Sequence, residues 1–449
     1  MNAGAAPHSV RPAPVEGQEG AQATEGPRLR QAQPERMGFA QPGRMGLAHP
    51  ERSGGAQPGR LEGAPSERSG DAQPEPLEMA QSLAERPLRI AILGLSITSS
   101  WGNGHATTWR ALVRALAQRG HDVLFLERDV PWYASHRDLP DPPWCRTVLY
   151  EDLDTLRTQW GEAIAGADLV IVGSFVPDGI EVGDWVQKQA RGVTAFYDID
   201  TPVTLAALAQ QACTYLSHSQ LPGYDLYLSF TGGPTLERLE RQFGARAARV
   251  LYCAVDPQLH AVQDVACSLD LGYMGTDSTD RRAGLETLLL APARRWPQGR
   301  FAVAGANHPG TEGWPANVRY VPHLPPPEHR AFYGSQRFTL NLTRADMRAA
   351  GWSPSVRLFE AAACGTPIIS DRWAGIEDVL TPGREIFLAD SADEVLALLT
   401  DLPEDQRRAA GEAARQRVLG AHTAEHRARE LEAYVAEAMG VAVSPEASP

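Results

Sequence analysis

The stretch from Asn341 to Asp378 constrains the fold more than any other part of this sequence. It reads in order as a strand end, a polar loop, a helix, a glycine, a short apolar strand and the start of a second helix. The first helix is predicted to begin after Ser353, because serine is a good N-cap and a proline and an alanine-rich run follow. Gly365 is predicted to end it. The apolar run at 367–369 then predicts a buried parallel strand.

Two charged residues interrupt this otherwise apolar helix. Arg357 and Glu360 are three residues apart, so they lie on one surface of the helix. One interpretation is a solvent-facing ion pair. The other places both at the edge of the sheet, where the N–H groups at a helix start attract anions, an arginine fork suits a diphosphate and a carboxylate accepts ribose hydroxyls. The second interpretation predicts a nucleotide site.

Four motifs resemble those of the CgeB-like glycosyltransferases, which belong to the two-domain GT-B type of sugar transferase. They are SPSVRLFEAAACGTPIISD (353–371), YDIDTP (197–202), LSFTGGPTL (228–236) and HTAEHRAREL (422–431). The resemblance covers residues 87 to 438, approximately. It implies an α/β fold of two doubly wound Rossmann-like domains that face a central cleft. It also implies a sugar-transfer reaction. We predict transfer of a hexosyl unit from a nucleotide-activated sugar to an acceptor hydroxyl.

The resemblance assigns positions of the donor site residue by residue. In the wider family of retaining two-domain transferases, an arginine and a lysine hold the donor diphosphate, and the matching places here are Thr276 and Arg281. Of the family's two glutamates, Glu360 keeps the second place, whereas Trp352 occupies the first. Arginines 281, 344, 348 and 357 are the cations that remain for a diphosphate. The predicted donor-binding residues are Arg281, Arg344, Ser355, Arg357, Glu360, Gly375 and Glu377.

The chain of 449 residues is long enough for two globular domains. We predict a disordered tail (1–86), an acceptor domain (87–257), a donor domain (258–420), and a C-terminal helix with a short tail (421–449). The resemblance implies that this last helix crosses back to the first domain. From Gln33 the tail repeats every eight residues, with proline and glycine in place of large apolar groups. Such a composition predicts disorder.

The first globular domain begins with a βαβ unit. The segments 88–97 and 121–129 read as strands joined by a glycine-rich loop and a helix, which predicts a parallel sheet with ligands at the carboxyl ends of its strands. Further strands are predicted at 168–172, 193–197, 224–230, 249–252, 269–276, 300–306, 317–324, 337–343 and 384–390. A dinucleotide-binding loop would have an acidic residue such as Glu127, but the glycines have the wrong spacing. We expect Gly102, Asn103 and Gly104 to form a cleft loop instead.

Three residues are candidates for catalysis. His105 follows the cleft loop and has a pKa suited to a general base; the alternative is a histidine that caps or packs at the helix start. Asp198 and Asp200 end a buried strand and could position an acceptor or act as base, or else cap the next helix. Asp-Ile-Asp also mimics a metal-binding motif, but hard cations need more oxygen ligands. We predict no required metal and no cofactor beyond the nucleotide-sugar substrate.

Composition limits the classes of molecule that this protein is expected to bind. The net charge of −13 disfavours nucleic acid or an anionic membrane as the main partner. The five scattered cysteines, the lack of an apolar run of about 20 residues and the lack of a signal-peptide core predict a cytoplasmic protein without a transmembrane segment. The acceptor is expected to be a glycan, a lipid-linked sugar or a protein. The aromatic and proline-rich segment 131–144 is a candidate acceptor loop.

Two other functions remain open from the sequence. The missing family glutamate and lysine are compatible with a non-catalytic scaffold that binds a nucleotide-sugar or a glycan in envelope-polysaccharide assembly. A nucleotide-sugar epimerase of the same two-domain architecture would interconvert the sugar without a second substrate. The scaffold predicts binding without turnover, whereas a transferase releases free nucleoside diphosphate.

Overall fold

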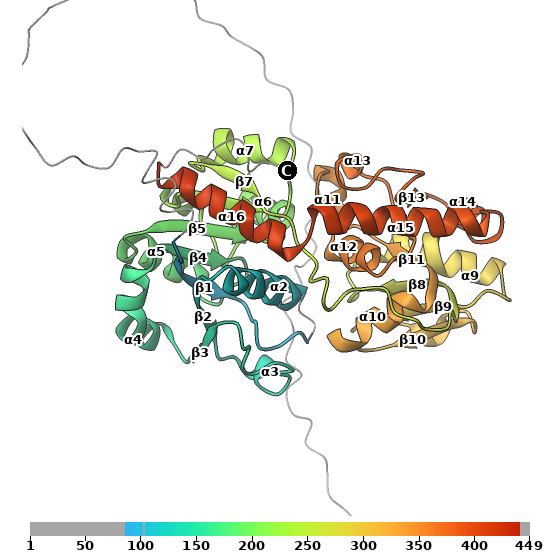
Figure 1. The fold of residues 1–449 in the computed structure, drawn as a ribbon, viewed down its shortest axis with the longest axis horizontal. Helices are drawn as coiled ribbons and strands as arrows, with labels where there is room; N and C mark the ends of the chain where they lie inside the picture. The colour runs from blue at the N-terminus through green and yellow to red at the C-terminus, as the bar shows by residue number, and fades with distance from the viewer. Residues whose placement is uncertain (1–85, 102–103, 441–449) are drawn as a thin grey trace, which may run out of the picture. The chain divides into compact units, whose positions relative to one another are not determined.

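The computed structural model describes residues 86–101 and 104–440. The predicted disordered tail, apart from Arg86, lies outside the described residues, as do Gly102 and Asn103 of the predicted cleft loop. The described chain forms two parallel sheets, each with its own set of helices (Figure 1). The two doubly wound units predicted from the sequence are thereby confirmed.

The first sheet has seven strands within the described residues, in the order β3-β2-β1-β4-β5-β6-β7, and all neighbours are parallel. The strands are β1 (Arg89–Gly94), β2 (Asp122–Arg128), β3 (Arg146–Tyr150), β4 (Leu169–Gly173), β5 (Val193–Asp198), β6 (Leu226–Ser229) and β7 (Ala248–Val250). The helices are α2 (Gly104–Gln118), α3 (Pro131–Ala134), α4 (Leu153–Gly166), α5 (Gly179–Gln189), α6 (Thr201–Ala209), η1 (His218–Gly223) and α7 (Pro234–Phe243). Strand β3 was not predicted. Its apolar run covers only three residues, 148–150, and the strand is only partly buried.

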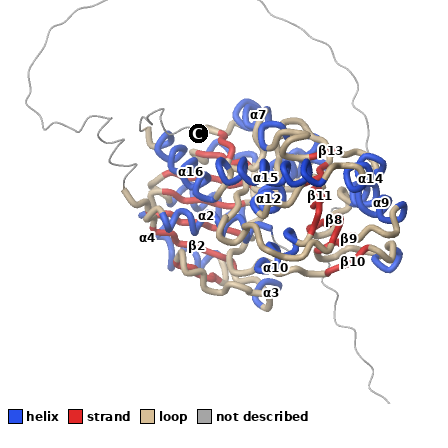
Figure 2. Tube along the Cα trace, turned by 45° about the vertical axis from the view of Figure 1, so that its right-hand side comes forward, coloured by secondary structure: helices blue, strands red, loops and turns tan. Residues whose placement is uncertain are grey.

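Strand β1 shows why helices cover both faces of this sheet (Figure 2). Ile90 and Ile92 belong to a core shared with α2, whereas Ala91 and Leu93 belong to a core shared with α4 and α5. Successive side chains of a strand point to opposite faces of the sheet. The continuous apolar run at 90–93 therefore needs helices on both faces.

The second sheet has six strands in the described part of the chain, in the order β10-β9-β8-β11-β12-β13, again all parallel. They are β8 (Leu269–Met274), β9 (Phe301–Ala304), β10 (Val318–Val321), β11 (Gln336–Asn341), β12 (Ile368–Ser370) and β13 (Phe387–Leu388). Its helices are α8 (Arg282–Leu285), η2 (Glu286–Leu290), α9 (Ala291–Arg295), η3 (Thr311–Gly313), α10 (Pro326–Gly334), α11 (Ala345–Ala350), α12 (Val356–Ala363), α13 (Ile376–Val379), α14 (Ala392–Thr400) and α15 (Glu404–Ala421). We call the part of the chain from β8 to α15 the second lobe.

The last helix, α16 (Ala424–Ala438), packs beside α2, and we include it in the first lobe with β1 to α7 and β7 (Figure 1). Glu432 accepts hydrogen bonds from Arg119 at 2.5 Å and pairs with His121 at 2.7 Å. Tyr434 donates to the carbonyl of Val250 at 3.0 Å. The domain boundaries near residues 257 and 420 stay predictions.

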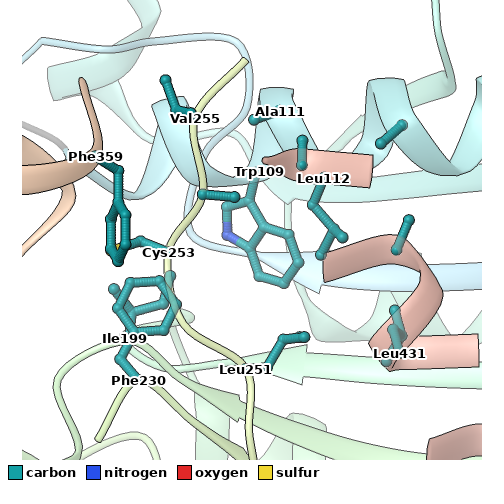
Figure 3. Packing of buried hydrophobic residues seen from close by; sticks show 14 of the residues in the cluster. Trp109, Ala111, Leu112, Ile199, Phe230, Leu251, Cys253, Val255, Phe359 and Leu431 are labelled. Atoms are coloured by element: carbon teal, nitrogen blue, oxygen red, sulfur yellow. The ribbon is translucent and has the colours of Figure 1, made fainter. Parts of the chain in front are cut away.

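One apolar core runs from the first lobe into the second. Figure 3 shows Phe359 of α12 near Cys253, with Trp109 of α2 on the other side of the segment that carries Cys253 and Val255. The hydroxyls of Thr231 and Ser353 also meet across the lobes at 2.9 Å. Burying these side chains ties α12 to the first lobe.

Candidate functional site

The carboxyl ends of strands from both sheets surround a cavity of about 720 Å³. The first lobe contributes residues that follow β1, β4, β5 and β6, and the second lobe contributes residues that follow β8 to β11 together with the start of α12. Open parallel sheets bind ligands at this edge. The cavity is therefore the candidate functional site.

The first lobe presents His105 and Asp200 to the cavity. His105 is the second residue of α2, and its ring makes an edge contact with Phe175 at 5.4 Å between centroids. Burial lowers the pKa of His105, and the negative charge of Asp200 opposes that shift. The imidazole is thus held neutral at neutral pH beside a carboxylate. A neutral imidazole can accept a proton.

Asp198 does not line the cavity, unlike Asp200. Its fully buried carboxylate accepts hydrogen bonds from Tyr227 at 2.5 Å and Thr204 at 2.8 Å. Burial raises the pKa of Asp198 to about 6 despite these hydrogen bonds. The side chain points into the first lobe, so of the two predicted aspartates only Asp200 faces the site. Asp200 is also the N-cap of α6, although its side chain makes no capping hydrogen bond.

Glu127 holds the segment that follows β1. Its buried carboxylate accepts hydrogen bonds from the N–H groups of Ile97 and Thr98, at 2.7 and 3.1 Å, and from the hydroxyls of Ser96 and Thr98, at 3.0 and 2.7 Å. The acidic residue that a dinucleotide site would use here instead fixes residues 96–98. Gly104, the described part of the predicted cleft loop, lines the cavity.

The predicted aromatic loop is fastened to this same segment. Asp138 accepts two hydrogen bonds from the buried Arg110, at 2.8 and 2.9 Å, and two from Ser100 at the same distances. Tyr133 lines the cavity, while Trp132 is 55% exposed. The ion pair between Arg110 and Asp138 therefore helps to fix the segment whose Tyr133 forms an aromatic wall of the cavity on the first lobe.

On the second lobe, α12 brings Arg357 and Glu360 into the cavity wall. Both side chains are buried, with 7% and 3% of their surface exposed, so the solvent-facing ion pair considered from the sequence is wrong. Arg357 donates to the carbonyl of Met274 at 2.5 Å and to Oδ1 of Asn341 at 2.8 Å. Glu360 accepts a hydrogen bond from Tyr333 at 2.9 Å. Each charge is thus fixed by a neighbour other than its helix partner.

The helix α12 begins two residues later than predicted, at Val356, with Ser355 as its N-cap. Ser353 cannot cap it, because its hydroxyl is bonded to Thr231 of the first lobe. Ser355 lines the cavity and donates to Oδ1 of Asn341 at 2.7 Å. Gly365 has a φ of +72° just after the helix, as its predicted role requires.

Two more arginines of the second lobe line the cavity. Arg281 is the N-cap of α8 and donates to the carbonyl of Thr276 at 3.0 Å. Arg344 lies 3.3 Å from Asp200 of the first lobe and 3.5 Å from Asp280. Together with Arg357, they gather three positive charges on one wall of the cavity.

Two residues of the predicted donor site, and one further arginine considered for the diphosphate, lie elsewhere. Arg348 is exposed and faces a separate pocket of about 170 Å³. Gly375 is the N-cap of α13, where it packs against the indole of Trp352, and Glu377 is exposed on the same helix. None of the three lines the larger cavity. The Trp352 side chain packs directly against Gly375.

Trp352, in the place of the family's first glutamate, joins the two lobes. Its carbonyl accepts the N–H of Gly232 at 2.8 Å, and its own N–H donates to Ala374 at 2.6 Å. Its indole N–H donates to Asp378 at 2.7 Å. Its φ of +45° is uncommon for a residue other than glycine. Contacts on both sides hold this strained backbone in place.

Sequence reasoning missed four polar residues of the site region: Asn341, His260, His329 and Tyr333. Asn341 could have been predicted as a site residue, because a buried amide at a predicted strand end needs hydrogen-bond partners. The other three come from the linker after β7 and from α10. Nothing in their local sequence shows that they meet α12.

Known proteins share this fold. Residues 281–433 match a protein family described as glycosyl transferase-like, and no curated protein matches the sequence. Sucrose-phosphate synthase from Thermosynechococcus elongatus has 18% sequence identity and a TM-score of 0.59, covering 79% of this chain and 100% of its own. Anabaena Alr3699/HepE in complex with UDP and glucose has 13% identity and a TM-score of 0.56, covering 78% and 100%. An alpha-glucosyltransferase in complex with UDP-glucose and DNA containing an abasic site has 13% identity and a TM-score of 0.59, also covering 78% and 100%.

These likenesses establish that the chain has the two-domain GT-B fold of glycosyltransferases. The described helices include none that is both long enough and apolar enough to cross a bilayer.

Proposed function

We propose that this protein is a CgeB-like glycosyltransferase of the cytoplasm, which transfers a hexosyl unit from a nucleoside diphosphate sugar to an acceptor hydroxyl. One observation carries the proposal. A single cavity places three arginines and Glu360 on the second lobe opposite His105 and Asp200 on the first. A transferase needs such a division, with anion binding on one wall and groups that handle a hydroxyl proton on the other.

The donor would bind to the second lobe. The arginines Arg281, Arg344 and Arg357 would neutralise the diphosphate, and Glu360 would accept ribose hydroxyls. Arg281 has a buried Nε that finds no hydrogen-bond acceptor among the described residues, which favours an anionic ligand here. UDP is the first nucleotide to test, because UDP occurs in two of the similar structures. With three cations present, we propose that the diphosphate needs no metal ion.

The acceptor would bind to the first lobe, between His105 and the aromatic wall at Tyr133. During transfer the bond from the anomeric carbon to the diphosphate oxygen breaks, and the acceptor oxygen forms the new bond to that carbon. In an inverting reaction the acceptor proton moves to His105, which burial keeps neutral. In a retaining reaction the proton leaves with the diphosphate, and His105 positions the acceptor.

A non-catalytic binding protein is the second candidate, favoured by one observation. Trp352 stands where the family has its first glutamate, Thr276 occupies one of the two places of the family's arginine and lysine, and Trp352 has an architectural role in joining the lobes. This candidate binds the nucleotide-sugar without turning it over.

The test begins with calorimetric titration of the protein with UDP, GDP, dTDP and ADP, each with and without magnesium. Selective binding of one nucleotide, insensitive to magnesium, supports the donor site and identifies the base. Incubation with the corresponding nucleotide-hexoses then follows release of free nucleoside diphosphate. Release at any measurable rate above that of an Arg357→Met control supports the enzyme. Binding without release favours the scaffold, and no binding to any nucleotide refutes the donor site.

A further inference from the structure

Three potential metal ligands from distant parts of the chain meet beside the cavity. His260 comes from the linker after β7, His329 from α10 and Glu360 from α12, and one ligand atom of each lies within 4.8 Å of the other two. His260 and Glu360 are nearly inaccessible, with 4% and 3% of their surface exposed. The ε-nitrogen of His260 lies 3.7 Å from Oε1 of Glu360, too far for a hydrogen bond. The three groups are therefore brought together without satisfying one another.

Both histidines have an unused nitrogen. Nδ1 of His260 and Nδ1 of His329 are buried and find no hydrogen-bond partner among the described residues. Leaving buried polar atoms unpaired is costly, and such atoms are uncommon in folded proteins. An ion in the cluster would supply the missing bond to Nδ1 of His329 and would bind Nε2 of His260, which is the His260 nitrogen nearest to Glu360.

The surrounding hydrogen bonds orient the ligand atoms. Nε2 of His329 lies 3.1 Å from the carbonyl of Leu324, so Nε2 carries the proton and Nδ1 keeps its lone pair. Tyr333 donates to Oε2 of Glu360, which leaves Oε1 facing His260. A backbone carbonyl behind a histidine and a hydroxyl behind a carboxylate are the supporting contacts that metal ligands commonly have.

The donor set selects the class of ion. Two imidazoles and one carboxylate suit zinc and similar d-block cations, whereas calcium and magnesium require more oxygen ligands. Because His329 and Glu360 also line the cavity, a fourth coordination position would face it. We propose that His260, His329 and Glu360 form a binding site for a divalent d-block cation such as Zn²⁺, with an open position toward the cavity.

The proposal requires a small local rearrangement. Tetrahedral zinc with bonds of about 2.1 Å brings its ligand atoms to roughly 3.4 Å from one another. The three side chains must therefore move inward by about 1 Å from their present separation of up to 4.8 Å.

The site is separate from the proposed diphosphate wall but shares Glu360 with the proposed ribose contact. The metal test therefore uses no nucleotide, so its failure and the failure of the donor site are distinguishable. Untagged full-length protein is treated with a chelator, dialysed and titrated with Zn²⁺ by calorimetry. A parallel titration with Co²⁺ is followed by visible absorption, which reports a tetrahedral nitrogen and oxygen site.

The expected result is one ion per chain with Kd below about 10 μM. His260→Ala and His329→Ala should each weaken binding at least tenfold. His323→Ala is the matched control, since His323 lines the same cavity outside the cluster and its loss should leave the affinity unchanged. If an alanine variant does not fold, His260→Asn and His329→Asn replace it, with circular dichroism as the check. Absence of saturable binding below about 100 μM, or equal affinity in the wild type and both histidine variants, overturns the proposal.

Discussion

Replacing Arg357 tests the most specific feature of the donor site. Its Nε and Nη1 atoms are held by the carbonyl of Met274 and by Asn341, at 2.5 and 2.8 Å, while Nη2 lies beside Gly275 in the cavity wall. The fork is therefore oriented before any ligand arrives. Arg357→Met removes the charge but keeps an apolar stem near the ring of Tyr273, which lies 4.9 Å from the guanidinium carbon.

The expected loss of UDP affinity follows from the hydrogen bond that the substitution removes. A hydrogen bond to a charged group contributes about 1.5–3 kcal/mol, so UDP binding should weaken roughly 10- to 150-fold. Uridine lacks the diphosphate, and its affinity should change by less than about threefold. Any loss of stability in the variant affects both ligands alike, so the ratio of their Kd values isolates the phosphate contact.

Calorimetry with UDP and uridine measures this ratio, and a thermal melt confirms that the variant is folded. Arg348→Met is the matched control, because Arg348 belongs to the same lobe but is exposed and faces a different pocket. It should bind UDP as the wild type does. Equal weakening for UDP and uridine in Arg357→Met, or unchanged UDP affinity, would refute a phosphate contact by Arg357.

Three further predictions address other parts of the site. His105→Ala should lower kcat about 100- to 10,000-fold and leave the Kd for UDP nearly unchanged, whereas an unimpaired rate removes His105 as the base. Asp198 has a pKa raised from 3.8 to about 6, so the folded state holds its proton more tightly than the unfolded chain, and its contribution to stability falls as pH rises through this interval. The free energy of unfolding of Asp198→Asn minus that of the wild type should therefore increase by roughly 3 kcal/mol from pH 3.5 to pH 7, and a constant difference in chemical denaturation contradicts this. Because Glu360 is shared, saturating Zn²⁺ should weaken UDP binding at least tenfold in the wild type but not in His329→Ala, and independent binding of the two ligands would show that Glu360 does not serve both.

The architecture could be predicted because it depends on local patterns. Continuous apolar strands alternating with helices specify a parallel sheet, and the run from Asn341 to Gly365 already contained a strand end, a helix and its glycine stop. The exact start of α12 could not be predicted, because the hydroxyl of Ser353 is bonded to Thr231, more than a hundred residues earlier in the chain. Capping rules use only the local sequence, in which Ser353 is a suitable N-cap residue.

The sequence does not show which of the carboxylates belong to the site. Glu127, Asp198 and Asp200 lie near predicted strand ends and Glu360 lies in the predicted helix that faces the same edge, and the sequence does not rank them. The structure separates them by their hydrogen-bond donors. Glu127 has four donors from the loop at 96–98, and Asp198 has Tyr227 and Thr204, so both are fixed inside the first lobe.

Asp200 and Glu360 line the cavity, and each lies near a charged or titratable group from elsewhere in the chain. For Asp200 that group is Arg344 at 3.3 Å, and for Glu360 it is His260 at 3.7 Å. A buried carboxylate whose donors all come from its own surroundings is architectural, whereas one that lines the cavity and has a loosely placed partner can exchange that partner for a ligand. This criterion assigns Asp200 and Glu360 to the site, and it requires the long-range contacts that only the folded chain provides.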